Sequence, residues 1–102
     1  MNEFVSYLSD ENYVIIGINN GKVNAISNEV IDGIHQALNI AEKDDKVVIL
    51  TGLSGIFSGG FDLKVMTKSS EFAKELVTKG SKLSYRMLSF PKPIIVACNG
   101  HA

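Results

Sequence analysis

The sequence predicts an α/β fold, because short apolar runs alternate along it with two long stretches of helical periodicity. The runs at residues 13–18, 47–50 and 94–98 are rich in β-branched residues, as strands are. The helical stretches run from about residue 28 to 43 and from 71 to 88. The order β-β-α-β-loop-α-β favours a parallel sheet with crossover connections, whose strands are covered on both faces.

The chain begins with a predicted β-hairpin. Residues Phe4 to Leu8 alternate between apolar and polar side chains, and Ser9 to Asn12 form a turn before the apolar run at 13–18. Asn19, Asn20 and Gly21 follow as a second turn, because asparagine and glycine tolerate positive φ.

The two helices have recognisable ends. Ser27 is a plausible N-cap for the first helix, with Glu29 near the positive end of the helix dipole. The second helix ends before Pro91, since proline cannot continue a helix. Helical spacing predicts buried faces made of Val30, Ile31, Ile34, Ala37, Leu38 and Ala41 in the first helix, and of Phe72, Leu76, Leu83, Met87 and Leu88 in the second.

Composition excludes several classes of protein. The 102 residues suffice for one small domain, and the net charge of −1 predicts no nucleic-acid partner. Cys98 is the only cysteine, so no intrachain disulfide can form, and its apolar surroundings predict a buried filler. The two histidines and one cysteine lie too far apart in sequence for a metal site. Short apolar runs and an N-terminus unlike a signal peptide predict a cytoplasmic protein without a membrane partner.

The loop from Phe57 to Lys64 has the composition of an anion-binding turn. Gly59 and Gly60 let the backbone turn sharply and approach a ligand closely. Unpaired N–H groups near the start of a helix can point at one negatively charged oxygen, as in an oxyanion hole. Asp62 is expected to cap the following helical turn and fix the loop, with a role as an acid or base as the alternative. A plain turn between a strand and a helix is the alternative explanation for this composition.

Three segments of the chain, taken together and in order, resemble a known family. Residues 21–26 read Gly-Lys-Val-Asn-Ala-Ile, residues 57–64 read Phe-Ser-Gly-Gly-Phe-Asp-Leu-Lys, and residues 90–102 read Phe-Pro-Lys-Pro-Ile-Ile-Val-Ala-Cys-Asn-Gly-His-Ala. Their motifs and spacing are similar to those of the crotonase superfamily, the enoyl-CoA hydratase/isomerase family. The resemblance implies the crotonase-like β-β-α spiral of the ClpP/crotonase fold, with residues 1–102 as the N-terminal part of a single domain.

The resemblance also implies site residues. The backbone N–H of Phe61 matches the first oxyanion-hole donor, so its phenyl group is incidental to that hydrogen bond. Two further sets match substrate contacts. The loop that lines the thioester corresponds to Gly60, Asp62, Leu63 and Lys64. The stretch whose backbone contacts the adenine end of CoA corresponds to Lys22, Val23 and Ala25. Gly59 stands where another small residue commonly precedes the family's glycine, which is a mild departure from the family pattern. His101 is expected only to line or support the site.

The function implied is that of an enoyl-CoA hydratase/isomerase-like enzyme, which stabilises a thioester enolate. Coenzyme A enters as part of the acyl-CoA substrate and no separate cofactor is implied; the subunits are expected to form homotrimers or dimers of trimers. The family's second donor and its hydratase glutamates correspond to positions after Ala102, so the reaction type stays open. The alternative is a non-catalytic crotonase-fold protein that binds acyl-CoA or a partner.

Overall fold

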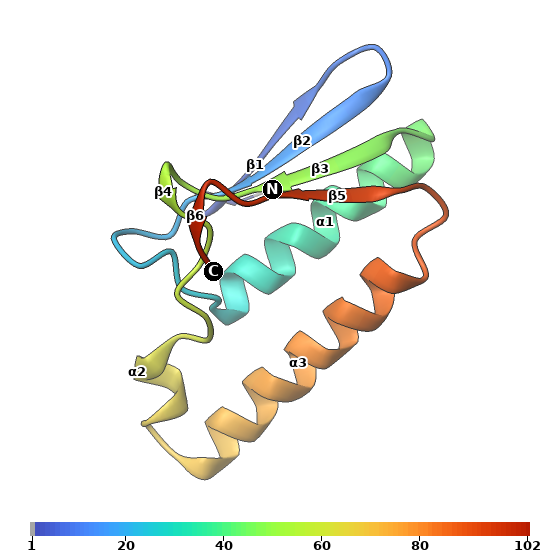
Figure 1. The fold of residues 1–102 in the computed structure, drawn as a ribbon. Helices are drawn as coiled ribbons and strands as arrows, with labels where there is room; N and C mark the ends of the chain where they lie inside the picture. Colours follow the sequence, from blue (N-terminus) through green and yellow to red (C-terminus); the bar gives the residue numbers. More distant parts are fainter. Residues whose placement is uncertain (1) are drawn as a thin grey trace.

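A computed structural model describes residues 2–102, and it confirms the α/β class. Four strands form one sheet in the order β1-β2-β3-β5 (Figure 1). They are β1 (Val5–Ser9), β2 (Tyr13–Ile18), β3 (Val47–Thr51) and β5 (Ile94–Ala97). The predicted hairpin pairs β1 with β2 antiparallel, while β2, β3 and β5 run parallel. The three parallel strands therefore end at the same edge of the sheet.

Two long helices lie on one side of this sheet (Figure 1). Helix α1 (Asn28–Asp44) packs against β1 and β2, and α3 (Ser70–Leu88) packs against α1. Between β3 and α3 the chain forms the short strand β4 (Gly55–Ile56) and the four-residue helix α2 (Leu63–Met66). Strand β4 pairs in parallel with β6 (Gly100–His101), so the segment after β5 returns to the segment after β3.

The helix ends follow the local signals in the sequence. The Oγ of Ser27 accepts a hydrogen bond from the Val30 amide at 3.2 Å, which confirms the predicted N-cap. Ser69 caps α3 in the same way by accepting from the Phe72 amide. Asp45 caps the C-terminal end of α1 in a left-handed conformation with φ of 56°.

One core fills the space between the sheet and the helices. All six residues predicted for the buried face of α1 are buried, and they pack against alternate residues of the strands. Helix α3 contributes fewer buried residues, of which Leu76 and Leu83 are fully or nearly buried. The buried apolar residues are Val5, Val14, Ile16, Ile18, Val30, Ile31, Ile34, Ala37, Leu38, Ala41, Val48, Leu50, Leu76 and Leu83.

The prediction of a buried last strand was wrong for this part of the chain. Strand β5 lies at the edge of the sheet, where Ile95 and Val96 are 53% and 47% exposed. Cys98, expected to be buried, is exposed just beyond it. Both helices lie on one side of the sheet, so Ile49 on the other face is only partly buried, and the prediction of cover on both faces fails here.

The buried face predicted for α3 was also too wide. Phe72 is 45% exposed and Leu88 is 88% exposed, near the two ends of the helix. A Lys68 ammonium lies 4.9 Å from the centre of the Phe72 ring instead.

Charged side chains also join α1 to α3. Lys79 pairs with Asp32 at 3.0 Å, and Arg86 pairs with Glu42 at 3.5 Å. The Arg86 guanidinium also donates toward Nδ1 of the half-buried His35 at 3.3 Å. A guanidinium has no acceptor, so Nδ1 is the acceptor and the neutral ring carries its proton on Nε2.

We expect His35 to make stability depend on pH near neutrality. Burial, and then the charge of Arg86, lower the pKa of His35; Lys79 acts in the same direction and Asp32 opposes it. The folded state therefore binds fewer protons than the unfolded chain, so stability is lost as the pH falls through the unfolded value of about 6.5. Thermal melts of the full-length protein between about pH 8 and pH 5.5 should show this loss.

The matched variant is His35→Gln, which cannot titrate and should flatten that part of the profile. An equal slope in both proteins would assign the loss to other groups. The pKa of Asp10 is lowered mainly by the hydrogen bond from the Glu11 amide. The stability that this contributes is lost only at a pH below the range of these melts.

No helix within residues 2–102 combines the length and the apolar character that crossing a membrane requires.

Candidate active site

The three sequence segments with family resemblance meet at one edge of the sheet. Residues 21–26 follow β2, residues 57–64 follow β3, and the last part of residues 90–102 follows β5. The carboxyl ends of parallel strands are the usual place for a ligand site in such sheets. The topology therefore explains why segments so far apart in sequence converge.

Backbone hydrogen bonds hold the middle segment between the other two. On one side, the Gly59 amide donates to the Val23 carbonyl at 2.7 Å. On the other side, the amides of Phe57 and Ser58 donate to the His101 carbonyl at 2.6 and 3.3 Å. His101 thus supports the loop through its main chain, while its side chain is exposed.

The Phe61 amide points away from the neighbouring segment. The Gly60 carbonyl accepts from the Ile26 amide at 2.7 Å, and the Asp62 amide donates to the Ile26 carbonyl at 2.9 Å. In a trans peptide the C=O of Gly60 and the N–H of Phe61 point in opposite directions, so this N–H faces away from Ile26. Within residues 2–102 no group accepts a hydrogen bond from it.

Gly60 and its neighbours fix this orientation. Gly60 has a φ of 95°, which is strained for any other residue, although the space around it is open. The Gly60 amide itself donates to the buried Oγ of Ser58 at 3.0 Å. Asp62 accepts from the Lys64 amide at 2.9 Å and caps α2, as predicted.

Most of the site residues predicted from the sequence line one cavity, which we call the loop cavity. Its volume is about 280 Å³. Lys22 is the one predicted residue that does not line it. Its walls are Val23, Ala25, Ile56, Gly59, Gly60, Phe61, Asp62, Leu63 and Lys64.

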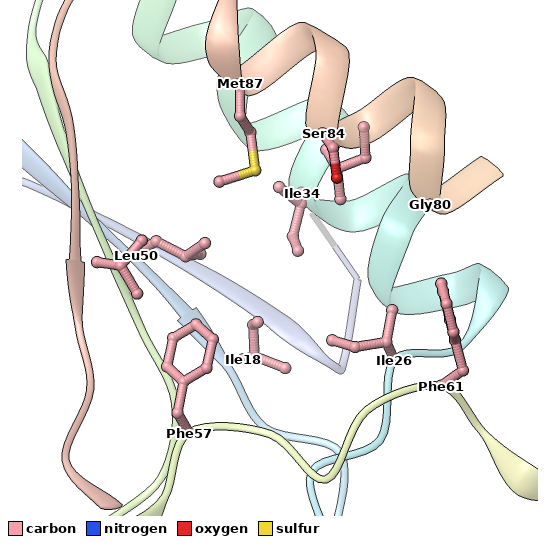
Figure 2. Close-up of a pocket in the computed structure, with 11 residues that line it drawn as sticks. Ile18, Ile26, Ile34, Leu50, Phe57, Phe61, Gly80, Ser84 and Met87 are labelled. Carbon is pink, nitrogen blue, oxygen red and sulfur yellow. The ribbon is translucent and has the colours of Figure 1, made fainter. Parts of the chain in front are cut away.

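A second cavity, which we call the apolar cavity, lies between α3 and the ends of the strands (Figure 2). It measures about 270 Å³. Figure 2 shows Met87 and Ser84 of α3 on one side of it, and Leu50 and Phe57 on the other. Phe61 lines both cavities, so the two adjoin at this residue. The remaining walls are Ile18, Ile26, Ile34, Gly80, Leu83 and Val96.

Asn24 organises the site, a role that the sequence analysis missed. It is fully buried, with a left-handed φ of 50°. Its Nδ2 donates to the carbonyls of Ile18 and Phe57 at 3.0 and 2.8 Å, and its Oδ1 accepts from the Asn20 amide at 2.6 Å. One side chain therefore joins the end of β2 to the start of the Phe57–Lys64 loop. The tolerance of asparagine for positive φ was the only local signal.

Other parts of the surface offer less chemistry. A larger hollow of about 490 Å³ lies on the outer side of α1, over Asn39, Glu42 and Lys43, away from the three segments. Over the range 2–102, no three histidine, cysteine or acidic side chains lie close enough together to hold a metal ion.

Comparison with known proteins agrees with this architecture, which is the N-terminal part of the crotonase fold. The family model described as enoyl-CoA hydratase/isomerase matches residues 9–102. The chain therefore belongs to the enoyl-CoA hydratase/isomerase family.

Individual relatives show how far the similarity extends. A structure of an enoyl-CoA hydratase/isomerase family protein from Pseudomonas syringae is 58% identical, with a TM-score of 0.96 over 98% of this chain and 44% of that one. An enoyl-CoA isomerase from Mycobacterium tuberculosis is 39% identical, with a TM-score of 0.92 over 100% of this chain and 45% of its own. A probable enoyl-CoA hydratase from Bacillus subtilis is 34% identical over 96% of this chain and 40% of its own length. The chain thus spans less than half the length of these relatives.

Proposed function

We propose that the protein is an enoyl-CoA hydratase/isomerase-type enzyme, whose Phe61 amide donates a hydrogen bond to the thioester carbonyl of an acyl-CoA. The observation that carries this proposal is the direction of the amide. It faces away from Ile26, no group within residues 2–102 accepts its hydrogen bond, and Phe61 lies where two cavities adjoin. An N–H that is free and held in one direction can donate to a ligand oxygen that gains negative charge.

The physical basis is selective stabilisation of the transition state. As the α-carbon reacts, negative charge builds on the thioester oxygen, and a hydrogen bond to that oxygen strengthens. The bond helps the reaction because Gly60 and the Ile26 contacts hold the donor in place beforehand. Asp62 serves to fix the loop, since its Oδ1 is engaged by the Lys64 amide.

The two cavities suit the two parts of such a substrate. The loop cavity would receive the thioester and the adjoining part of CoA, along Gly60, Leu63 and Lys64, while the stretch of Lys22, Val23 and Ala25 would contact the adenine end. The apolar cavity would receive the acyl chain, because apolar side chains from three strands and two helices surround it.

The reaction requires a second donor and an acid/base group. We propose that both belong to a further region of the full-length protein, which corresponds to the part of the relatives that residues 1–102 do not match. Relatives named as hydratases and as isomerases are both similar to this chain, so both reactions belong to the proposal. The cytoplasmic location and the assembly into homotrimers or dimers of trimers also stay predictions.

Titration calorimetry of the full-length protein tests substrate binding directly. Butanoyl-CoA should release or absorb heat with a saturating 1:1 profile per subunit, and free CoA should bind more weakly because it lacks the thioester carbonyl and the acyl chain. Parallel assays would follow hydration of a 2-enoyl-CoA and double-bond migration in a 3-enoyl-CoA. Binding without either activity would favour the non-catalytic alternative, and the absence of any binding would refute the proposal.

A further inference from the structure

The Phe61 side chain occupies a space that α3 provides by having a glycine in its interior. A Cβ built on Gly80 would lie only 2.8 Å from the Cε1 and Cζ atoms of the Phe61 ring. Glycine in the middle of a 19-residue helix is unfavourable relative to alanine, so it needs a reason in packing. The ring of Phe61 supplies that reason, and Figure 2 shows it extending from the loop toward Gly80.

This placement makes the ring a wall of the apolar cavity. Phe61 is 37% exposed, and its ring lies against Gly80 of α3 and lines the cavity. The ring belongs to the residue whose amide is the proposed donor, so the first carbons of an acyl chain must pass beside it. The sequence resemblance treats the ring as incidental to the hydrogen bond, whereas the structure places it where it restricts space.

We propose that the Phe61 ring, seated on Gly80, determines which acyl chains the apolar cavity accepts, and that it limits the cavity to chains of short and medium length. This inference rests on the proposed function. The ring forms one wall of this cavity of about 270 Å³, so its position sets how far an acyl chain can extend past Gly80. Butanoyl, octanoyl and dodecanoyl chains differ in steps of four methylenes, so together they locate the limit that the ring sets.

The test measures the Kd of butanoyl-, octanoyl- and dodecanoyl-CoA by calorimetry on the full-length protein. Each methylene that enters an apolar site improves affinity by about fourfold, so the wild-type Kd should fall from butanoyl- to octanoyl-CoA and then level off. Phe61→Ala removes the wall. The ratio of the octanoyl-CoA Kd to the dodecanoyl-CoA Kd should then be at least about tenfold higher than in wild type.

Gly80→Ala tests the same wall without altering Phe61. The added Cβ would lie 2.8 Å from the ring and displace it, so the ratio of the octanoyl-CoA Kd to the butanoyl-CoA Kd should change by about tenfold. Alanine is favourable in a helix, so this variant keeps the test valid if Phe61→Ala folds poorly. Ser81→Ala is the matched control, because Ser81 is the exposed neighbour on the same helix and should leave the profile unchanged.

The outcomes separate this inference from the proposed function. If wild type binds acyl-CoA and both variants keep its chain-length profile, the ring has no role in selection and this inference is refuted alone. If wild type binds none of the three thioesters, the proposed function fails and this inference fails with it.

Discussion

Phe61→Pro lowers kcat/KM of the full-length protein by about 10²–10³-fold, which is the effect of removing one oxyanion-hole donor, about 3–4 kcal/mol. Proline has no N–H, so the substitution deletes the proposed donor. The two hydrogen bonds that tie the loop to Ile26 use the Gly60 carbonyl and the Asp62 amide, and both groups remain. Because the lost bond is strongest in the transition state, kcat should fall more than the affinity for acyl-CoA.

Two further variants protect this test against a folding defect. Phe61→Leu keeps the N–H and removes the ring, so it should retain far more activity than Phe61→Pro toward the same short thioester. Gly60→Ala adds only one methyl group in open space, but it strains a φ of 95° and should turn the Phe61 amide, with a large loss of turnover. Circular dichroism and melting temperature would show whether each variant folds. A folded Phe61→Pro enzyme with wild-type turnover would remove Phe61 from the mechanism.

Local signals predicted the elements because each depends on a few adjacent residues. Ser27 caps α1 with its own hydroxyl, and the β-branched run at residues 13–18 forms β2, whose Val14 and Ile16 lie in the core. Asp62 likewise caps the helical turn that directly follows it. The site loop was predictable only because three segments were compared together with a family pattern, since a pair of glycines alone is typical of any turn.

Features that depend on distant contacts could not be predicted in this way. An apolar run such as Ile94 to Cys98 has the same composition in a central strand and at a sheet edge, so the exposure of Ile95 and Cys98 was missed. A glycine is needed at position 80 because the Phe61 ring packs there, and nothing in the sequence of α3 indicates that contact. The same holds for Asn24, whose three partners lie before and after it in the chain.

Asn24→Asp should destabilise the protein by about 3–5 kcal/mol, because it removes the donors of one buried and one partly buried carbonyl at about 1–3 kcal/mol each and places a carboxylate beside them. Aspartate keeps the shape of the side chain and tolerates the left-handed backbone, so the loss reports the missing donors and the added charge, not a change of shape or backbone strain. The measurement is the free energy of unfolding in urea for the full-length protein. Asn39→Ala, at an exposed position of α1, is the matched control and should change it by less than about 0.5 kcal/mol.

The same substitution should also affect the site, because Asn24 is the side chain that holds the Phe57 carbonyl at the start of the loop. Under conditions where Asn24→Asp remains folded, hydrogen exchange should be faster at the amides of Ser58 to Asp62 than in the control variant, since their segment loses an anchor. Turnover should fall with it, because a donor that moves is no longer oriented in advance. Unchanged stability and unchanged exchange in Asn24→Asp would mean that the backbone bonds to Val23, Ile26 and His101 position the Phe61 amide without help from this side chain.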